Sequence, residues 1–97
     1  MNWKEYISEE FINEDIIPLE VKDLEPDLKK FFTRFKSSVL RINWITQNKK
    51  MNIALDASLG KGSTFYPKDL KQIAKFSNLE WMGFDSSTNT IRFVFKK

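Results

Sequence analysis

The sequence predicts an α+β domain in which two β-hairpins flank a helix and form a mainly antiparallel four-stranded sheet, with further helices at the N-terminus. Two observations lead to this fold class. Four short segments alternate apolar and polar residues, as half-buried strands do. Three other segments repeat their apolar residues at helical spacing. The expected element order is therefore ααββαββ, with the helices packed on one side of the sheet.

Length and composition fit this fold. The chain has 97 residues, of which 41% are hydrophobic and 14% aromatic, and this is enough for one domain with a packed core. We expect residues 1–97 to form this single domain. Within it, residues 1–28 are expected as an acidic helical segment and residues 29–97 as a basic α+β body.

Two helices are expected before the first strand. In the first, at about residues 3–13, apolar residues recur at roughly helical spacing, and Ser8 offers a second starting point because acidic residues follow it. Pro18 stops whatever precedes it, and the residues that follow are expected as an extended connection. The second helix begins near Pro26 and ends near Ser38. Its apolar stripe consists of Leu28, Phe31, Phe32 and Phe35.

Two β-hairpins follow, one on each side of a third helix. In the first, "VLRINWI" and "MNIALD" alternate on either side of the polar turn "TQNKK". In the second, "LEWMGFD" and "TIRFVFKK" flank the turn "SSTN". Between the hairpins, Pro67 opens a helix whose Leu70, Ile73 and Ala74 are expected to point inward.

Several residue types on which enzymes depend are absent. The chain has no cysteine and no histidine, which removes disulfides, thiol chemistry, the usual general base and the commonest zinc ligand. No basic segment followed by an apolar one predicts secretion, and no apolar run is long enough to span a membrane. We therefore expect a cytoplasmic, non-enzymatic protein without a cofactor, a metal ion or a small-molecule substrate.

Three motifs resemble parts of enzyme sites but fail on spacing. In "GKGST", Lys61 lies between two glycines that a single residue separates, which does not meet the Walker A pattern. Asp27 and Asp69, in "PD" and "DLK", fall at helix starts far apart in the chain, so they are interpreted as first-turn acids rather than nuclease ligands. Asp56 and Asp85 each end a strand and could meet at a metal ion, but turns also favour aspartate there.

Charge is divided unevenly along the chain. Residues 1–28 contain two lysines and nine acidic residues, whereas residues 29–97 contain fourteen lysines or arginines and four acidic residues. This division is typical of a basic binding body with an acidic arm, and it equally fits two halves that attract each other after folding. Both interpretations stay open from the sequence.

The basic body predicts contact with nucleic-acid backbones. Lys68, Lys71 and Lys75 share the outer face of the third helix, and Arg41 and Arg92 project from strands. The other candidate contacts, in the first hairpin turn and the glycine loop, are Lys49, Lys50 and Lys61. Distributed lysines bind RNA or DNA phosphates with little sequence preference. Three arginines against thirteen lysines argue against the reading of bases.

An alternative hypothesis assigns binding to the acidic segment. Its carboxylates would mimic nucleic-acid charge and occupy a basic groove of a nucleic-acid-handling protein, for example a host defence nuclease. Trp3, Trp44 and Trp81 are expected in the core, but Trp3, near the terminus and beside acidic residues, could instead anchor such a partner or a second copy of the chain. The residues of this alternative site are Trp3, Glu5, Glu9, Glu10, Glu14 and Asp15.

The composition also carries a resemblance. A short domain rich in Lys, Asn and Ile, without Cys, His or a catalytic signature, resembles many proteins that phages and mobile elements of AT-rich bacteria encode. The resemblance implies a stoichiometric role, as an inhibitor of a host nucleic-acid enzyme or as a nucleic-acid-binding protein. The exposed edges of a short sheet also leave a homodimer open.

Overall fold

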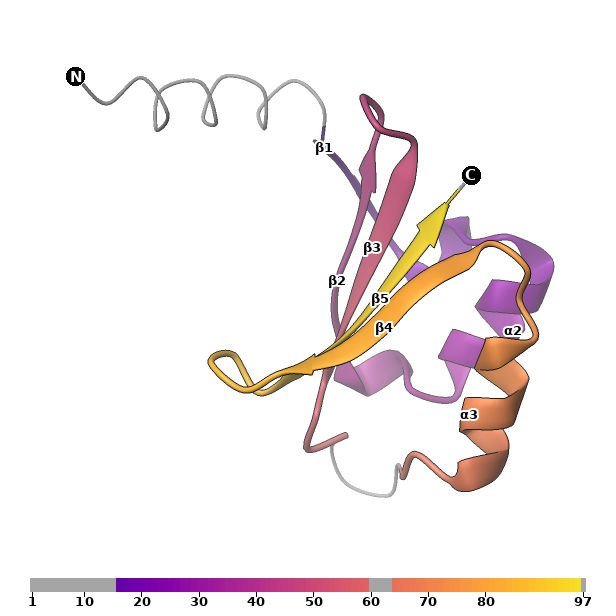
Figure 1. Cartoon of the computed structure of the whole chain (residues 1–97), viewed down its shortest axis with the longest axis vertical. Helices are drawn as coiled ribbons and strands as arrows, with labels where there is room; N and C mark the ends of the chain where they lie inside the picture. The colour runs from indigo at the N-terminus through magenta and orange to yellow at the C-terminus, as the bar shows by residue number, and fades with distance from the viewer. Residues whose placement is uncertain (1–15, 60–63, 97) are drawn as a thin grey trace.

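The computed structural model describes residues 16–59 and 64–96, which form a five-stranded antiparallel sheet with helices on one face (Figure 1). The strand order is β1-β2-β3-β5-β4. The strands are β1 (Ile16–Leu19), β2 (Val39–Ile45), β3 (Lys50–Asp56), β4 (Leu79–Asp85) and β5 (Thr90–Lys96). The helices are the 3-10 turn η1 (Val21–Asp23), α2 (Pro26–Thr33), the 3-10 turn η2 (Lys36–Ser38) and α3 (Pro67–Ala74).

This architecture corrects the predicted four-stranded sheet and its order ααββαββ. The fifth strand, β1, lies where an extended connection was expected around Pro18. Among the described strands, β1 lies at the edge and pairs only with β2, and an edge tolerates proline because the missing amide hydrogen can face away from the neighbouring strand. Four residues that include a proline give too short a pattern for recognition as a strand. The helix expected at residues 3–13 lies outside the described residues.

Both hairpins and the remaining two helices are present, but α2 ends at Thr33 rather than near Ser38, where the 3-10 turn η2 follows instead. α2 and α3 each begin at a proline, Pro26 and Pro67, whose fixed backbone angle suits the first turn of a helix. β2 pairs with β3 and β4 pairs with β5, while the pairing of β3 with β5 joins the two hairpins into one sheet. No helix within the described ranges is long and apolar enough to cross a membrane.

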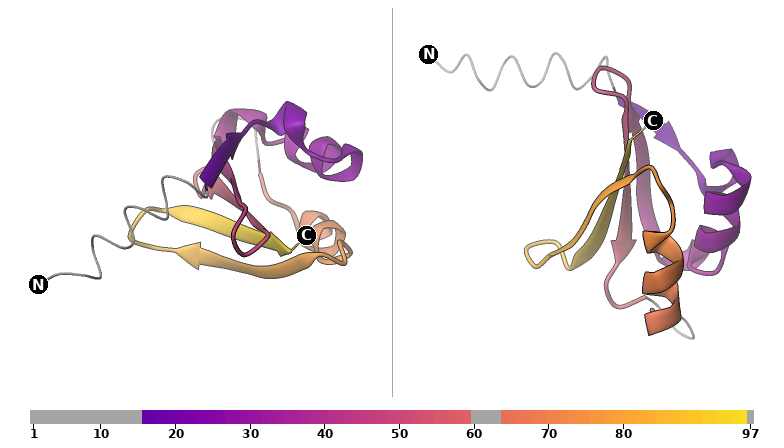
Figure 2. Two further views of the ribbon diagram at one scale, coloured as in Figure 1. Left: turned by 90° about the horizontal axis from the view of Figure 1, so that it is seen from above. Right: turned by 45° about the vertical axis from the view of Figure 1, so that its right-hand side comes forward.

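The core lies between the helices and one face of the sheet, as Figure 2 shows. Phe32 of α2 is fully buried, and its ring meets the rings of Phe93 and Phe95 on β5 edge to face, with centroids 5.4 and 6.4 Å away. Ile73 of α3 is also fully buried. Burial of this apolar area, together with the favourable ring geometry, holds both helices on the same side of the sheet.

An ion pair joins α2 to α3. Arg34 donates a hydrogen bond to Asp69 over 2.7 Å and another to the carbonyl oxygen of Thr64, and its guanidinium lies over the rings of Phe35 and Tyr66. The Asp69 carboxylate also accepts a hydrogen bond from the backbone amide of Tyr66, in the first turn of α3. The predicted role of Asp69 as a first-turn acid is therefore confirmed, and the ion pair adds a tertiary role.

Three residues that were expected on apolar faces are exposed. A bulge between Val39 and Arg41 displaces Leu40, which is exposed although the alternation of β2 predicted it to be half-buried. Leu70 and Ala74 of α3 are also exposed, because this helix turns Asp69 and Ile73 toward the core instead.

Replacement of Phe32 by alanine is expected to lower the free energy of unfolding by about 3–5 kcal/mol, because the ring is fully buried and a cavity would remain. Urea unfolding would measure the loss. Phe84→Ala is the matched control, since its ring is 59% exposed and its removal should cost only about 0.5 kcal/mol. Equal losses in the two variants would contradict the placement of the core.

Candidate nucleic-acid interface

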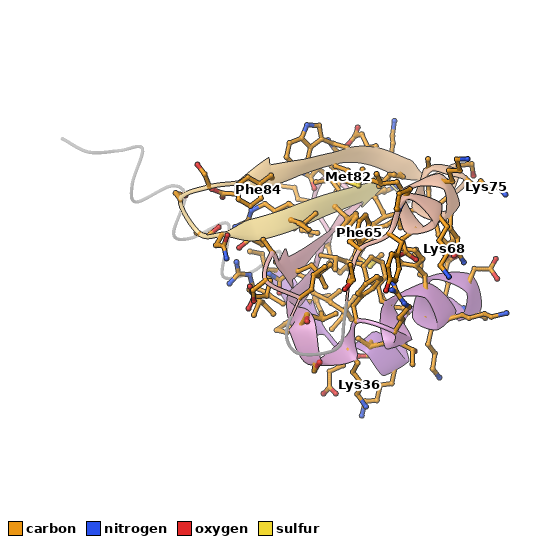
Figure 3. All side chains as sticks on the ribbon, turned by 90° about the horizontal axis from the view of Figure 1, so that it is seen from below. Lys36, Phe65, Lys68, Lys75, Met82 and Phe84 are labelled. Carbon is orange, nitrogen blue, oxygen red and sulfur yellow. The ribbon has the colours of Figure 1, made fainter. Side chains whose placement is uncertain are left out.

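The lysines predicted from the sequence lie in separate regions. Lys68, Lys71 and Lys75 are exposed on α3, on the helix-covered side of the sheet (Figure 3). Lys49 lies in the turn between β2 and β3, and Lys50 begins β3. Figure 1 shows this turn at the end of the sheet far from α3. The structure therefore does not bring the two groups of lysines together.

The other predicted site residues lie outside the described ranges. They are Lys61 of the glycine loop and the alternative set Trp3, Glu5, Glu9, Glu10, Glu14 and Asp15. The boundary expected between residues 28 and 29 falls within α2, and β1 belongs to the same sheet as the strands of the basic body. Binding through the acidic segment stays a prediction, and a site built from described residues has to be sought elsewhere.

One face of the sheet carries no helix of the described ranges, and the register identifies its residues. Ile42, Ile53 and Phe93 stand opposite one another on β2, β3 and β5 and point into the core. Because successive side chains of a strand point to opposite faces, their sequence neighbours point to the uncovered face. We call this surface the open face. Its residues include Arg41, Asn43, Lys50, Asn52, Ala54, Trp81, Gly83, Arg92, Val94 and Lys96.

One row of the open face crosses four strands. Arg41 of β2 stands opposite Ala54 of β3, which stands opposite Arg92 of β5. Arg92 in turn stands opposite Gly83 of β4. Neighbouring strands lie about 4.8 Å apart, so this row spans roughly 14 Å. Ala54 is only 2% exposed without any described helix above it, so the longer side chains around it cover its methyl group.

The indole of Trp81 occupies the β4 end of the row. A Cβ atom added to Gly83 would collide with the six-membered ring of Trp81, which means that the indole lies directly on the glycine backbone. The rest of the side chain faces solvent, and 52% of Trp81 is exposed. The expectation that Trp81 belongs to the core is therefore wrong. A bulge between Leu79 and Trp81 changes the alternation of β4 and places the indole on the open face.

The cations of the open face differ in their pairing. The Nε atom of Arg92 contacts Asp85 at 3.3 Å, and Lys50 pairs with Glu80 at 2.9 Å. Arg41 forms no ion pair with any residue of the two described ranges. Arg41 can therefore give its whole guanidinium fork to a ligand, and Arg92 can give the two terminal nitrogens that its contact with Asp85 leaves unused.

The two aspartates considered as metal ligands have a role in turns that explains their positions. Asp56 and Asp85 stand on either side of Thr90, at one end of the sheet. Each accepts hydrogen bonds from the backbone amide and the hydroxyl of the serine two residues further on, Ser58 and Ser87 respectively. Within residues 16–59 and 64–96, no group of three or more acidic, cysteine or histidine side chains could hold a metal ion.

Comparison of the chain with protein-family models, with curated proteins and with solved structures finds no match. The role of the open face is therefore argued from its chemistry. Guanidinium groups bind phosphate with paired hydrogen bonds, and an exposed indole stacks on planar rings or on cations. Nucleotides contain both of these targets, a phosphate and a planar ring.

The pKa of Asp85 lies below its ordinary value of 3.8, chiefly because the Ser87 hydroxyl donates a hydrogen bond to the carboxylate, with a smaller contribution from Arg92. A carboxyl group whose pKa falls on folding stabilises the fold above its unfolded-state pKa of about 3.9. That contribution disappears as the pH falls through the folded-state value.

Ser87→Ala is therefore expected to raise the pKa of Asp85 and to make the stability less dependent on pH below about pH 4. Carbon-13 NMR titration of the Asp85 carboxyl, together with urea unfolding at a series of pH values, would measure both effects. An unchanged pKa in the variant would show that the hydroxyl is not the cause.

Proposed function

We propose that this protein binds single-stranded nucleic acid across the open face of its sheet, with little preference for sequence and without catalysis. The row that ends at Trp81 carries the proposal, because it places two guanidinium groups and an exposed indole on one surface. Proteins that bind single strands without sequence preference combine a positively charged track with aromatic stacking surfaces. The open face offers both.

The arginines of the row suit phosphates of a strand that crosses the sheet. Arg41 and Arg92 lie on either side of β3, so their backbones are about 9.6 Å apart, two strand spacings. Ala54 between them carries only a methyl group, so no long side chain from this position occupies the space that the sugar-phosphate backbone would need. Each guanidinium can donate two parallel hydrogen bonds to one phosphate, and such contacts carry no sequence information.

Trp81 favours an unpaired base over a duplex. Bases within a duplex hide their flat faces by stacking on each other, whereas a single strand can turn a base onto an aromatic side chain. Such stacking contributes about 1–3 kcal/mol for each base, and it is tolerant of sequence because every base has a flat face. Stacking on the indole would therefore favour single strands over duplexes without favouring any sequence.

The lysines of α3 form a competing phosphate surface. Lys68, Lys71 and Lys75 are exposed, and the only acidic residue of α3, Asp69, is buried against Arg34. These lysines lie on the helix-covered side, away from Trp81, and lysines on a helix surface commonly contact only water. Variants on the two sides of the sheet therefore distinguish the two surfaces.

Trp81→Ala is expected to weaken binding of single-stranded oligonucleotides about five- to hundredfold, the effect of losing one stacked base. Phe84→Ala is the matched control, since Phe84 is an equally exposed aromatic residue of β4 on the opposite face. Fluorescence anisotropy with labelled single- and double-stranded DNA and RNA would measure both variants. Equal losses in the two variants, or tighter binding of duplexes than of single strands, would overturn the proposal.

Arg41→Gln is expected to weaken binding to all sequences alike and to lower the slope of log affinity against log salt by about one. Removal of the same charge from α3 in Lys75→Gln should leave the slope close to that of the wild type. A series of affinities from low to physiological salt would give both slopes. If Lys75→Gln lowers the slope and Arg41→Gln does not, the phosphate contacts lie on α3.

A further inference from the structure

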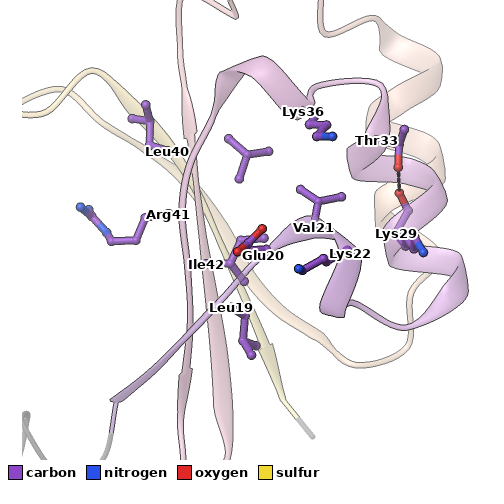
Figure 4. Close-up of a pocket in the computed structure, with 11 residues that line it drawn as sticks. Leu19, Glu20, Val21, Lys22, Lys29, Thr33, Lys36, Leu40, Arg41 and Ile42 are labelled. Atoms are coloured by element: carbon purple, nitrogen blue, oxygen red, sulfur yellow. Dashed lines mark hydrogen bonds between the residues drawn. The ribbon is translucent and has the colours of Figure 1, made fainter.

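A hollow lies where the open face ends at the edge of β2. β1 pairs only with Ile42–Ile45 of β2, so in the described part of the chain Val39, Leu40 and Arg41 have no neighbouring strand on that side. η1 and α2 flank this uncovered stretch and help to enclose a volume of about 500 Å³ (Figure 4). Arg41 marks the boundary between two surfaces, because the hollow lies on the helix-covered side of β2 whereas the Arg41 side chain points to the open face (Figure 4).

The hollow carries a concentrated positive charge. Three lysines line it, Lys22, Lys29 and Lys36, with Arg41 at its rim, against the single carboxylate of Glu20. None of the four cations forms an ion pair with another residue of the described ranges. Cations gathered without counter-charges repel one another, and a bound anion with more than one negative charge relieves this repulsion most.

Among the polar side chains beside α2, the lysines are the ones that can donate hydrogen bonds to a ligand in the hollow. Figure 4 shows Thr33 on α2 between Lys29 and Lys36. The Thr33 hydroxyl donates a hydrogen bond to the carbonyl oxygen of Lys29 over 2.5 Å, so its hydrogen is not available to a ligand. Val21 and Val39 supply apolar surface beside these groups, against which a sugar or a base can lie.

The helix dipole accounts for only part of this arrangement. Cations near the C-terminal end of a helix interact favourably with its dipole, and this suits Lys36, which follows α2. The effect is confined to the last turn of a helix, so it explains neither Lys22 on η1 nor Arg41 on β2. Lysines from η1, α2 and η2 thus line one hollow beside β2, and Arg41 lies at its rim with the guanidinium directed away from them (Figure 4).

We propose that this hollow binds a phosphate monoester dianion, presented by the end of a nucleic-acid strand on the open face or by a free nucleotide. The strand-end form rests on the function proposed above, whereas the site itself does not. A monoester carries a charge of about −1.5 to −2 near neutral pH, while a phosphodiester inside a strand carries about −1. The charge of the hollow therefore favours a strand end over the middle of a strand.

The test compares oligothymidylates of about ten nucleotides that carry a 5′-phosphate, a 3′-phosphate or hydroxyl groups at both ends. The full-length wild-type chain is expected to bind one of the phosphorylated strands about tenfold more tightly than the unmodified strand. The double variant Lys29→Gln/Lys36→Gln should lose this gain. Lys71→Gln/Lys75→Gln, which removes the same charge from α3, should keep it. All four lysines are exposed, and circular dichroism would verify that both variants fold.

Equal affinity of the wild type for the three strands would overturn the strand-end form, and a gain that survives Lys29→Gln/Lys36→Gln would place the phosphate elsewhere. Titration with thymidine monophosphate alone, followed through the backbone amide of Thr33 by NMR, tests the site without a strand. A shift of the Thr33 amide signal in the wild type that is absent from the double variant supports the phosphate site in the hollow. If no oligonucleotide binds at the same time, the proposed function fails, and the phosphate comes from a free nucleotide. If neither probe responds to the phosphate, the site is refuted.

Discussion

The packing of phenylalanine rings from α2 against one face of the sheet is the constraint on which the rest of the structure depends. Phe32 meets Phe93 and Phe95 at the centre of this core, and the Arg34–Asp69 ion pair couples α3 to α2 on the same side. Because both helices are held there, the opposite face of the sheet carries no described helix. Side chains on that face do not pack against a described helix, and the strand register with its bulges determines which of them are neighbours.

One-sided packing thereby connects the fold with both proposed binding surfaces. The register aligns Arg41, Arg92 and the glycine beneath Trp81 in one row, although these residues come from three separate strands. The shortness of β1 has a second effect, because it leaves the edge of β2 uncovered at Arg41 and opens the hollow beside α2. A strand that follows the row from β4 to β2 reaches Arg41 at this edge, and the lysines of the hollow lie beyond the edge on the helix-covered side.

Local sequence signals predicted the elements better than their assembly. Alternation and proline positions were sufficient for both hairpins and for α2 and α3, because these features depend on neighbouring residues. β1 escaped prediction because four residues around Pro18 show no alternation long enough to recognise. Trp81 was assigned to the core because a bulge is not visible in a hydrophobic pattern, although the glycine two residues later is a signal that an aromatic ring can lie on an edge strand. Lys22, Lys29 and Lys36 of the hollow recur every seventh residue, but they lie on three separate helical elements, so the sequence alone did not show that they line one surface.

The most direct test of the central claim is a two-dimensional NMR titration of the isotope-labelled protein with a single-stranded oligothymidylate. If the open face binds the strand, the indole NH of Trp81 and the backbone amides around Arg41, Ala54 and Arg92 should shift together, and the amides of α3 should change little. Shifts confined to Lys68, Lys71 and Lys75 on α3, with the Trp81 indole unmoved, would contradict the assignment of nucleic-acid binding to the open face.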